Sequence, residues 1–553
     1  MSYARHRFLC LVGWIVGAGY APATAQDNGE PAAASIIETG AVPWARYVQA
    51  VTRLYALHAD SPVWLEELRV SPSGRAAIHE LLRAEMHGLD QADYQAKTLD
   101  SLARRAVREP LSRIDGDRLD ALLSVSLIRY LDDLQFGRLH PRVLDRSGAD
   151  TGLDLARAIH DAIAGDSIPR LVTAASPRLA QYRNLQRLLA RYRQLAGDPS
   201  LTPIAPTSTV RVGDRYSEAA ALRWRLAAVG DLDGGSAIDL SSRYSADDSA
   251  AVRRFQARHG QPGTGELDSA TVAELATPFS WRVRQIELAL ERLRWLPPIG
   301  SQRFIVVNIP AFQLFAFDSG GGTGTSALGM RVIVGNALDT RTPVLFERMR
   351  YVEFRPYWYV PFGIARKEII PLVQKDPGYL RRSAMEIVSL KDSVLGDAGT
   401  PDILEQIGRG ELRLRQRPGL ANPLGLVKFV FPNSAAVYLH GTPRPELFER
   451  SRRDFSHGCI RIEDPTTLAT WVLRDRARWG RSAIAAAQHG ATTVRAYLSR
   501  PMPVVVWYTT AVSAPDGKAR FYSDIYGHDR KLDQALQTRA VTASAPGGRR
   551  TIY

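Results

Sequence analysis

The sequence contains very little cysteine: only Cys10 and Cys459 occur in its 553 residues. We expect Cys10 to be removed with a cleaved N-terminal segment, which leaves one thiol in the mature chain. A single cysteine cannot form an internal disulfide, so a fold held together by disulfides is excluded. Cys459 is therefore either buried and inert or chemically active, and its sequence neighbours must decide between these two interpretations.

The sequence also lacks the motifs of nucleic-acid binding, although its formal net charge is +14. It has no basic run interleaved with aromatic residues, no phosphate-binding glycine loop and no zinc-finger spacing. The arginines are scattered along amphipathic stretches, which is typical of a solvated surface. A basic surface also suits a polyanionic polymer or an anionic membrane face. We therefore expect no nucleic-acid partner.

Long apolar runs are absent beyond the N-terminus. Arg5, His6 and Arg7 precede an apolar stretch from Phe8 to about Tyr20, and residues 23–25 read Ala-Thr-Ala. This pattern predicts a secretory signal peptide. An uncleaved anchor is the alternative, but the stretch is short for a span of about 20 residues and contains three glycines. We predict cleavage after Ala25 and export of the mature protein.

The first half of the mature chain has a helical pattern. Trp44, Tyr47, Val48 and Val51 recur at three- and four-residue spacing, and similar patterns continue to about Ala196. A stretch rich in Pro, Ser and Thr, residues 197–210, has the composition of a linker. Three short predicted helices follow. Their inward residues are expected to be Leu222, Leu226, Val252, Phe255, Val272 and Leu275.

After a connecting helix at about residues 281–295, the pattern changes to that of β-strands. Residues 304–309, 313–317 and 331–334 are runs of β-branched or aromatic residues separated by turns. Strands resume at 426–431 and 436–440, and a last strand pair brackets the turn at 515–517. Between these runs, residues 366–418 are more helical and charged. We predict a mostly-β domain with a helical insertion, and we interpret the insertion as a lid.

The residues around Cys459 favour a reactive thiol. Cysteine attacks a carbonyl only as its thiolate, so it needs a neighbour, usually histidine, that removes the proton. His440 ends a predicted strand 19 residues before Cys459, and a return loop of that length can place both on neighbouring strands. A backbone carbonyl near Gly441 could orient the histidine ring. The turn at Gly458 and Cys459 offers backbone N–H groups for an oxyanion.

Two alternatives to this interpretation remain. A structural cysteine would rarely occur in a Ser-His-Gly-Cys sequence between a strand and a helix. A zinc site would have to use His440, His457 and Cys459, which lack the closely spaced pairs that mark zinc ligands. We therefore predict neither a metal nor a cofactor.

Several motifs carry a resemblance to a known family. The sequences HGT at 440–442 and SHGCIR at 456–461 resemble the signature of the L,D-transpeptidase (YkuD-type) catalytic domain. FIVVNIPA, MRVIVG, YWYVP and NPLG match further family segments in the expected order. The string AVRRFQARHG…GTGELDSATVAEL resembles a three-helix peptidoglycan-binding module. Together with the terminal DIYGHD, the resemblance covers roughly residues 44–529 and points to the large periplasmic subgroup.

The resemblance implies a multidomain organisation. An all-α scaffold domain and a three-helix peptidoglycan-binding module precede a mostly-β L,D-transpeptidase catalytic domain with a helical lid insertion. The expected boundaries are signal peptide 1–25, scaffold 44–196, linker 197–210, binding module 211–277, catalytic domain 300–510 with the lid at about 366–418, and a C-terminal hairpin and tail at 511–553.

The resemblance also implies a two-step acyl transfer on peptidoglycan. Cys459 would attack the carbonyl between an L-centre at stem position three and a terminal D-Ala, with His440 as base and then acid. The amine of a second stem would resolve the thioester and form a 3→3 crosslink. The other implied roles are loop shaping by Ser456, His457, Gly458 and Gly441, binding of a substrate carboxylate or of the loop by Arg461, and lining of the cleft by Tyr438 and Trp358.

Implied partners are the peptide stems, the sacculus, wall synthases and, as covalent inhibitors, carbapenem-type β-lactams. Three alternative functions stay open. Water could resolve the thioester, which would make the protein an L,D-carboxypeptidase. A lipoprotein lysine could be the acceptor. A non-catalytic wall-binding scaffold would predict a broken Cys/His pair, whereas this sequence keeps both residues.

Overall fold

The computed structural model describes residues 44–139, 152–202, 204–205, 208–233, 239–299, 302–318 and 326–544. The predicted signal peptide at residues 1–25 lies outside the described residues. The chain divides into two compact units. One comprises residues 1–300, 321–325 and 509–553, and the other comprises residues 301–320 and 326–508. Each unit is described by itself below.

The first unit begins with a bundle of helices around an apolar core. Its helices are α2 (Trp44–Leu57), α3 (Pro72–Leu82), α4 (Ala96–Arg108), α5 (Arg113–Phe136), α6 (Leu155–Ala164), α7 (Ile168–Ala175) and α8 (Ala180–Ala196). Ser71 and Ser112 cap α3 and α5 by accepting hydrogen bonds from backbone N–H groups three residues later. The predicted inward face of α2 is confirmed, since Tyr47, Val51 and Leu54 are buried.

Three helices then form a smaller module. They are α9 (Ala219–Ala228), α10 (Ala246–Arg258) and α11 (Ser269–Ala276). All six residues that the sequence predicts to face inward are buried in one cluster. Helix α10 begins at Ala246, because Ser245 and Asp248 form a capping box at its N-terminus.

The end of the chain returns to this helical unit. The connecting helix α12 (Phe279–Trp295), strands β16 (Ala511–Ser513) and β17 (Ala519–Phe521), and helix α19 (His528–Ser544) all belong to it. Phe521 shares a core with Tyr192 of α8 and Ile286 of α12. Asp529 accepts a hydrogen bond from Arg292 Nη1 at 2.6 Å. The C-terminal segment is therefore packed against α8 and α12, a contact that the sequence did not predict.

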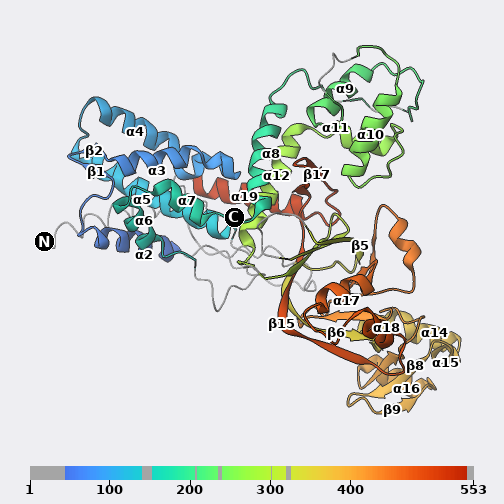
Figure 1. Ribbon diagram of the computed structural model, residues 1–553. Helices are drawn as coiled ribbons and strands as arrows, with labels where there is room; N and C mark the ends of the chain where they lie inside the picture. The colour runs from blue at the N-terminus through green and yellow to red at the C-terminus, as the bar shows by residue number, and fades with distance from the viewer. Residues whose placement is uncertain are drawn as a thin grey trace, which may run out of the picture. The chain divides into compact units, whose positions relative to one another are not determined.

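The second unit is built on a nine-stranded sheet of order β13-β5-β14-β12-β11-β6-β15-β3-β4. Strand β4 also pairs with β5, so the sheet closes on itself. The strands are β3 (Phe304–Asn308), β4 (Gln313–Phe317), β5 (Leu328–Gly335), β6 (Leu345–Phe354), β11 (Val427–Val430), β12 (Leu439–His440), β13 (Asp454–Ser456), β14 (Ile460–Ile462) and β15 (Val494–Trp507). Figure 1 shows α17 (Pro465–Leu473) beside this sheet.

The two faces of the sheet differ in character around β12. Val352, Phe429, Leu439, Ile460 and Ala496 are fully buried on one face. The residues that alternate with them on the same strands point to the other face, where polar side chains prevail. Alternation of this kind marks a sheet with one face on the core and one face open to a partner or solvent.

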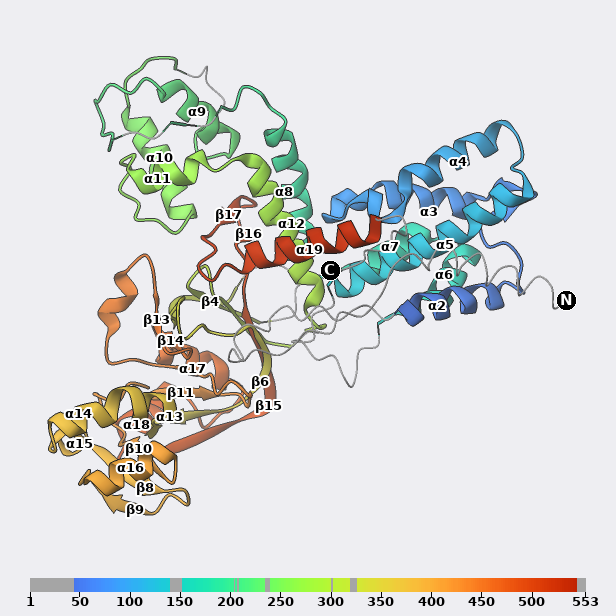
Figure 2. The same cartoon turned by 180° about the vertical axis from the view of Figure 1, so that it is seen from behind.

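The insertion in the second unit contains helices, as predicted, and its strands form a sheet that was not predicted. A strand and a short helix before residue 366 also belong to this part of the chain. Strands β7 (Trp358–Tyr359), β10 (Leu412–Gln416), β8 (Met385–Ser389) and β9 (Val394–Gly396) pair in that order. The helical segments are α13 (Phe362–Ile364), η4 (Ala365–Ile369), α14 (Ile370–Lys375), α15 (Tyr379–Arg382) and α16 (Pro401–Arg409). Buried residues such as Val373, Leu380 and Ile387 give the insertion its own core. Figures 1 and 2 show it at the end of the β6–β15 pair.

Candidate active site

The central feature of the site is the parallel pairing of β12 with β14. Leu439 lies opposite Ile460 and His440 lies opposite Arg461. Cys459 immediately precedes β14 and is therefore level with Tyr438, whose carbonyl accepts a hydrogen bond from Ile460 N at 2.9 Å. Paired residues on neighbouring strands point to the same face, so His440 and Cys459 share a face as diagonal neighbours. Their Cα atoms are about 8 Å apart by sheet geometry.

His440 is held in a defined orientation. Its side chain is buried, and its Nδ1 lies 2.6 Å from the carbonyl oxygen of Gly441. A proton on Nδ1 that is donated to this carbonyl leaves Nε2 as the acceptor. Burial lowers the pKa of His440 to about 3, the hydrogen bond to Gly441 opposes the shift, and the charges of Arg461 and Lys428 lower it further. The imidazole is therefore neutral at neutral pH.

Cys459 is half-buried, and its Sγ lies 3.8 Å from the carbonyl oxygen of Ala436. Burial raises the pKa of the thiol, while a backbone hydrogen bond at Tyr438 and the positive charges of Lys428 and Arg461 act in the opposite direction. A neutral thiol and a neutral imidazole therefore lie on the same face of the sheet in the resting site. This arrangement suits proton transfer during attack and does not require a preformed ion pair.

The turn before Cys459 is braced by Ser456. Its Oγ accepts a hydrogen bond from Gly458 N at 3.2 Å and donates to the carbonyl oxygen of Cys459 at 2.5 Å. Gly458 has a φ of 109°, a conformation that favours glycine. Because Gly458 N is already bonded, it is not free to bind an oxyanion. Cys459 N–H has no partner among the described residues and is the donor that remains at this turn.

Two threonines that the sequence analysis did not single out as site residues hold the same turn from the segment between β5 and β6. Thr340 Oγ1 donates to the carbonyl oxygen of Ser456 at 2.9 Å, and Thr342 Oγ1 donates to that of Gly458 at 2.8 Å. Thr342 Oγ1 also accepts from Gly335 N at 2.8 Å. A Cβ at Gly335 would collide with the backbone of Thr340, so only glycine allows this close packing. Thr342 is fully buried in the structure. The signal that the sequence offered for it was the Thr-Pro pair at 342–343.

A row of ionisable side chains crosses the polar face through His440. Lys428 pairs with His440, Glu353 pairs with Lys428, and Arg495 pairs with Glu353. The row therefore runs Arg461, His440, Lys428, Glu353, Arg495 over five strands. Sequence reasoning missed Lys428 and Glu353, although a lysine or glutamate within an apolar strand pattern marks a special position.

Lys428 is a cation of this row whose charge acts on both candidate catalytic residues. Its Nζ lies 4.0 Å from the centroid of the Tyr438 ring. Burial lowers the pKa of Lys428, whereas Glu353 and the Cys459 thiolate would raise it. Tyr438 itself is half-buried, and its pKa is raised by burial and by the same thiolate. Lys428 therefore supplies positive charge beside the sulfur.

The remaining predicted residues fall in different places. Arg461 is half-buried with no ion-pair partner among the described residues, and burial lowers its pKa. His457 is exposed, and its Nε2 lies 2.8 Å from Glu368 Oε1 of the insertion. Trp358 belongs to β7, pairs with Gln416 and packs against the core of the insertion. The nucleophile turn and the insertion are thus in direct contact through His457.

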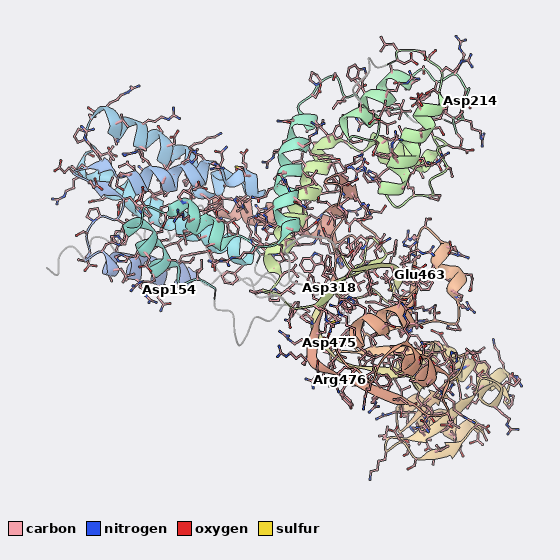
Figure 3. All side chains as sticks on the ribbon, viewed as in Figure 1. Asp154, Asp214, Asp318, Glu463, Asp475 and Arg476 are labelled. Atoms are coloured by element: carbon pink, nitrogen blue, oxygen red, sulfur yellow. The ribbon has the colours of Figure 1, made fainter. Side chains whose placement is uncertain are left out.

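Ion pairs outside the site hold its strands in register. Arg331 of β5 binds Glu463, which follows β14 and is labelled in Figure 3. Asp318, labelled in the same view, accepts a hydrogen bond from Trp471 Nε1 of α17 at 3.0 Å. Among the described residues, no cluster of three or more His, Cys, Asp or Glu side chains could hold a metal ion. No helix in the described part of the chain is long and apolar enough to cross a membrane.

Three segments of the chain match known families. Residues 302–506 match the L,D-transpeptidase catalytic domain, the family that the motifs around Cys459 resemble. Residues 302–506 are an L,D-transpeptidase catalytic domain. Residues 49–189 match the scaffold domain, and residues 215–275 match the family described as a candidate peptidoglycan-binding domain. The family assignment and the order of an all-α region before a β-rich catalytic domain are therefore confirmed.

A relative of this chain occurs in Haemophilus influenzae, where it is named a candidate L,D-transpeptidase. The two chains are 31% identical over 252 residues, which is 46% of this chain and 49% of the relative. The match thus spans about half the length of that relative. A solved L,D-transpeptidase from Stackebrandtia nassauensis aligns at 13% identity with a TM-score of 0.22, over 55% of this chain and 97% of the other. That overlap is too low to bear on the fold.

Proposed function

We propose that the protein is a peptidoglycan L,D-transpeptidase that forms 3→3 crosslinks through a thioester on Cys459. The observation that carries the proposal is the β12–β14 register within an L,D-transpeptidase catalytic domain. This register brings one thiol and one carbonyl-bound, neutral imidazole to the same face of the sheet. The combination is that of a nucleophile, a base and an orienting acceptor.

The first half-reaction forms the acyl-enzyme. Cys459 Sγ attacks the carbonyl that joins the stem-position-three L-centre to the terminal D-Ala, and its proton passes to His440 Nε2. Cys459 N–H stabilises the oxyanion. When the intermediate collapses, the C–N bond breaks and His440 returns the proton to the amine of D-Ala. The products are a thioester and free D-Ala.

The second half-reaction transfers the acyl group. The side-chain amine of a second stem attacks the thioester carbonyl, and His440 accepts a proton from that amine. Collapse breaks the C–S bond, and His440 reprotonates the departing sulfur. One amide bond is exchanged for another, so no oxidant, metal or nucleotide is needed. The positive charges of Lys428 and Arg461 stabilise the sulfur while it carries negative charge.

The side chains next to the reacting atoms have roles that their positions support. The half-buried Arg461 lies opposite His440 and would bind a carboxylate of the stem. Tyr438, held beneath Lys428, would line the cleft next to the sulfur. Trp358 would contact substrate together with the insertion, because its strand β7 pairs with β10 of that segment. Of the three, Trp358 is thus the one that would act together with a lid.

The insertion is proposed to be a substrate lid. It carries Glu368, which binds His457 two residues before the nucleophile. It also has its own core, so it can move as a body. A closed lid would keep water from the thioester and favour an amine acceptor over hydrolysis.

The wider setting follows from the same reaction. The protein would act in the periplasm, with its binding module on the sacculus and the peptide stems as substrates. Wall synthases would be its protein partners, and carbapenem-type β-lactams would acylate Cys459. Residues 366–418 would form the lid, and the boundaries proposed from the sequence apply to the other domains.

Incubation of the mature protein with tetrapeptide-bearing muropeptides tests the proposal. Mass spectrometry should detect a 3→3 dimer together with released D-Ala, and a transient acyl adduct on Cys459. Release of D-Ala without a dimer would identify a carboxypeptidase. Absence of both products would contradict the proposed function.

A further inference from the structure

Two tyrosines lie on the same face of the sheet as Cys459 but outside the site described above. Tyr351 of β6 pairs with Val430 of β11 and with Tyr497 of β15. Each tyrosine is two residues from a member of the ionisable row, Glu353 and Arg495, so both point to the polar face. Figures 1 and 2 both show β6 and β15 running side by side.

The two rings and Arg495 form a compact, accessible platform. The ring centroids are 5.1 Å apart with an interplanar angle of 46°. The Arg495 guanidinium lies 5.5 Å from the Tyr351 ring, and its Nε donates to Glu353 Oε1 at 2.7 Å. Tyr497 is 53% exposed, and the Arg495 side chain is 55% exposed. A large aromatic side chain left this open beside a fixed cation is a feature of ligand-binding surfaces.

The chemistry of the platform fits a pyranose ring. The C–H face of a sugar stacks on an aromatic ring, and its hydroxyl and acetyl oxygens accept hydrogen bonds from a guanidinium that is already oriented. Glu353 and the Tyr497 hydroxyl both hydrogen-bond Arg495 and so fix its guanidinium next to the two rings. A peptide carboxylate could bind Arg495 but would not make use of two tyrosine faces.

The distance from Cys459 to the platform matches the length of a peptide stem. The strand order β14-β12-β11-β6-β15 puts Tyr351 three strand spacings and Tyr497 four strand spacings from Cys459, which is about 14 and 19 Å. With scission after stem position three, three residues separate the sulfur from the sugar. Extended, they span about 10 Å, and the linker between the stem and the sugar adds a few ångströms more.

We propose that Tyr351, Tyr497 and Arg495 form a saccharide subsite that binds the muramyl sugar of the stem whose carbonyl is attacked. The proposal rests on the proposed function, because the distance argument assumes that the stem is cleaved at Cys459. It implies that the catalytic unit distinguishes a stem attached to glycan from a free peptide, with no contribution from the binding module.

Binding measured without turnover tests the subsite. The Cys459→Ala protein is titrated calorimetrically with a disaccharide-tetrapeptide and with the same tetrapeptide lacking sugar. Adding Tyr497→Ala should raise the Kd for the disaccharide-tetrapeptide roughly fivefold to tenfold. The Kd for the free tetrapeptide should not change, so the preference for the sugar-bearing ligand should fall by the same factor. Tyr497→Phe keeps the ring and should preserve this ratio. Arg500→Ala, an exposed change on the same strand, is the matched control.

The outcomes separate the subsite from the proposed function. Equal weakening of both ligands by Tyr497→Ala, or no weakening of either, would overturn the subsite. An unchanged melting temperature of the variant would show that the tyrosine does not act through stability. If the subsite behaves as expected but wild-type protein never forms an acyl adduct, the proposed function fails and the saccharide subsite stands.

Discussion

The Lys428 ammonium lies 4.0 Å from the centroid of the ring of Tyr438, the residue level with Cys459, and Lys428 pairs with His440. This places a partly desolvated cation beside the candidate nucleophile. Electrostatic attraction between the two is stronger there than in water, because the local dielectric is lower. The pKa of Lys428 is lowered by burial, yet the residue forms no ion pair among the described residues.

Replacing Lys428 by Met should therefore raise the pKa of Cys459. The positive charge of Lys428 favours the thiolate, so its removal shifts the thiol titration toward higher pH and slows alkylation at neutral pH. The rate of iodoacetamide alkylation as a function of pH measures the shift. Lys428→Arg keeps the charge and serves as the control. An identical titration midpoint in Lys428→Met and wild type would contradict the electrostatic role.

Cys459→Ala should abolish crosslinking while the fold stays intact. We expect a loss of roughly four orders of magnitude or more, and a nearly complete loss in His440→Ala, because the two residues act as one unit. The double variant should be no slower than the slower of the two single variants. Steady-state turnover of muropeptides measures all three. A double variant much slower than either single variant would mean that the two residues act independently.

Carbapenem-type β-lactams should acylate Cys459. Their strained carbonyl reacts with a thiol whose proton His440 can accept, and the thioester formed mimics the acyl-enzyme. Intact-mass spectrometry should show one adduct per chain, absent from Cys459→Ala. An adduct that persists in Cys459→Ala, or disappears only when another residue is changed, would place the reactive group elsewhere.

Loss of the His457–Glu368 contact should increase hydrolysis of the thioester. Glu368→Gln removes the charge that holds the insertion against the nucleophile turn, so the ratio of crosslinked to hydrolysed product should fall by about twofold to fivefold. Glu405→Gln breaks a comparable exposed pair with Arg409 on α16 and is the matched control. Replacing residues 366–418 by a short Gly-Ser loop should have a larger effect. A folded loop variant with the parent ratio and rate would show that the insertion is not a lid.

Deletion of residues 211–277 should weaken binding to purified sacculi by about tenfold and affect turnover of small muropeptides much less. Arg258 of this module donates to the carbonyl of Ala519, so the deletion also uncovers part of the C-terminal hairpin. Thermal unfolding must therefore accompany the co-sedimentation assay. Unchanged sacculus binding by a folded deletion variant would reduce the module to a structural role.

The sequence by itself identified the families of the domains and much of the core, and it predicted a reactive segment. Helix periodicity predicted Leu222, Phe255 and Leu275 as inward residues, because a helix must bury one face. The SHGCIR motif indicated the catalytic-domain family, because a chemical reaction requires particular residues in a fixed local order. These properties depend on neighbours along the chain, which a sequence displays directly.

Only the tertiary structure decided which distant residues meet. The strand register places Lys428 and Glu353 in one row with His440. The register also pairs Tyr351 with Tyr497, although 146 positions of sequence separate them. The insertion acquired a sheet because β10, from its far end, pairs with both β7 and β8. The hydrogen bond from Gly458 N to Ser456 likewise left Cys459 N–H as the free donor of the turn. Pairing and hydrogen-bond partners of this kind depend on packing between segments, and no local pattern along the chain encodes them.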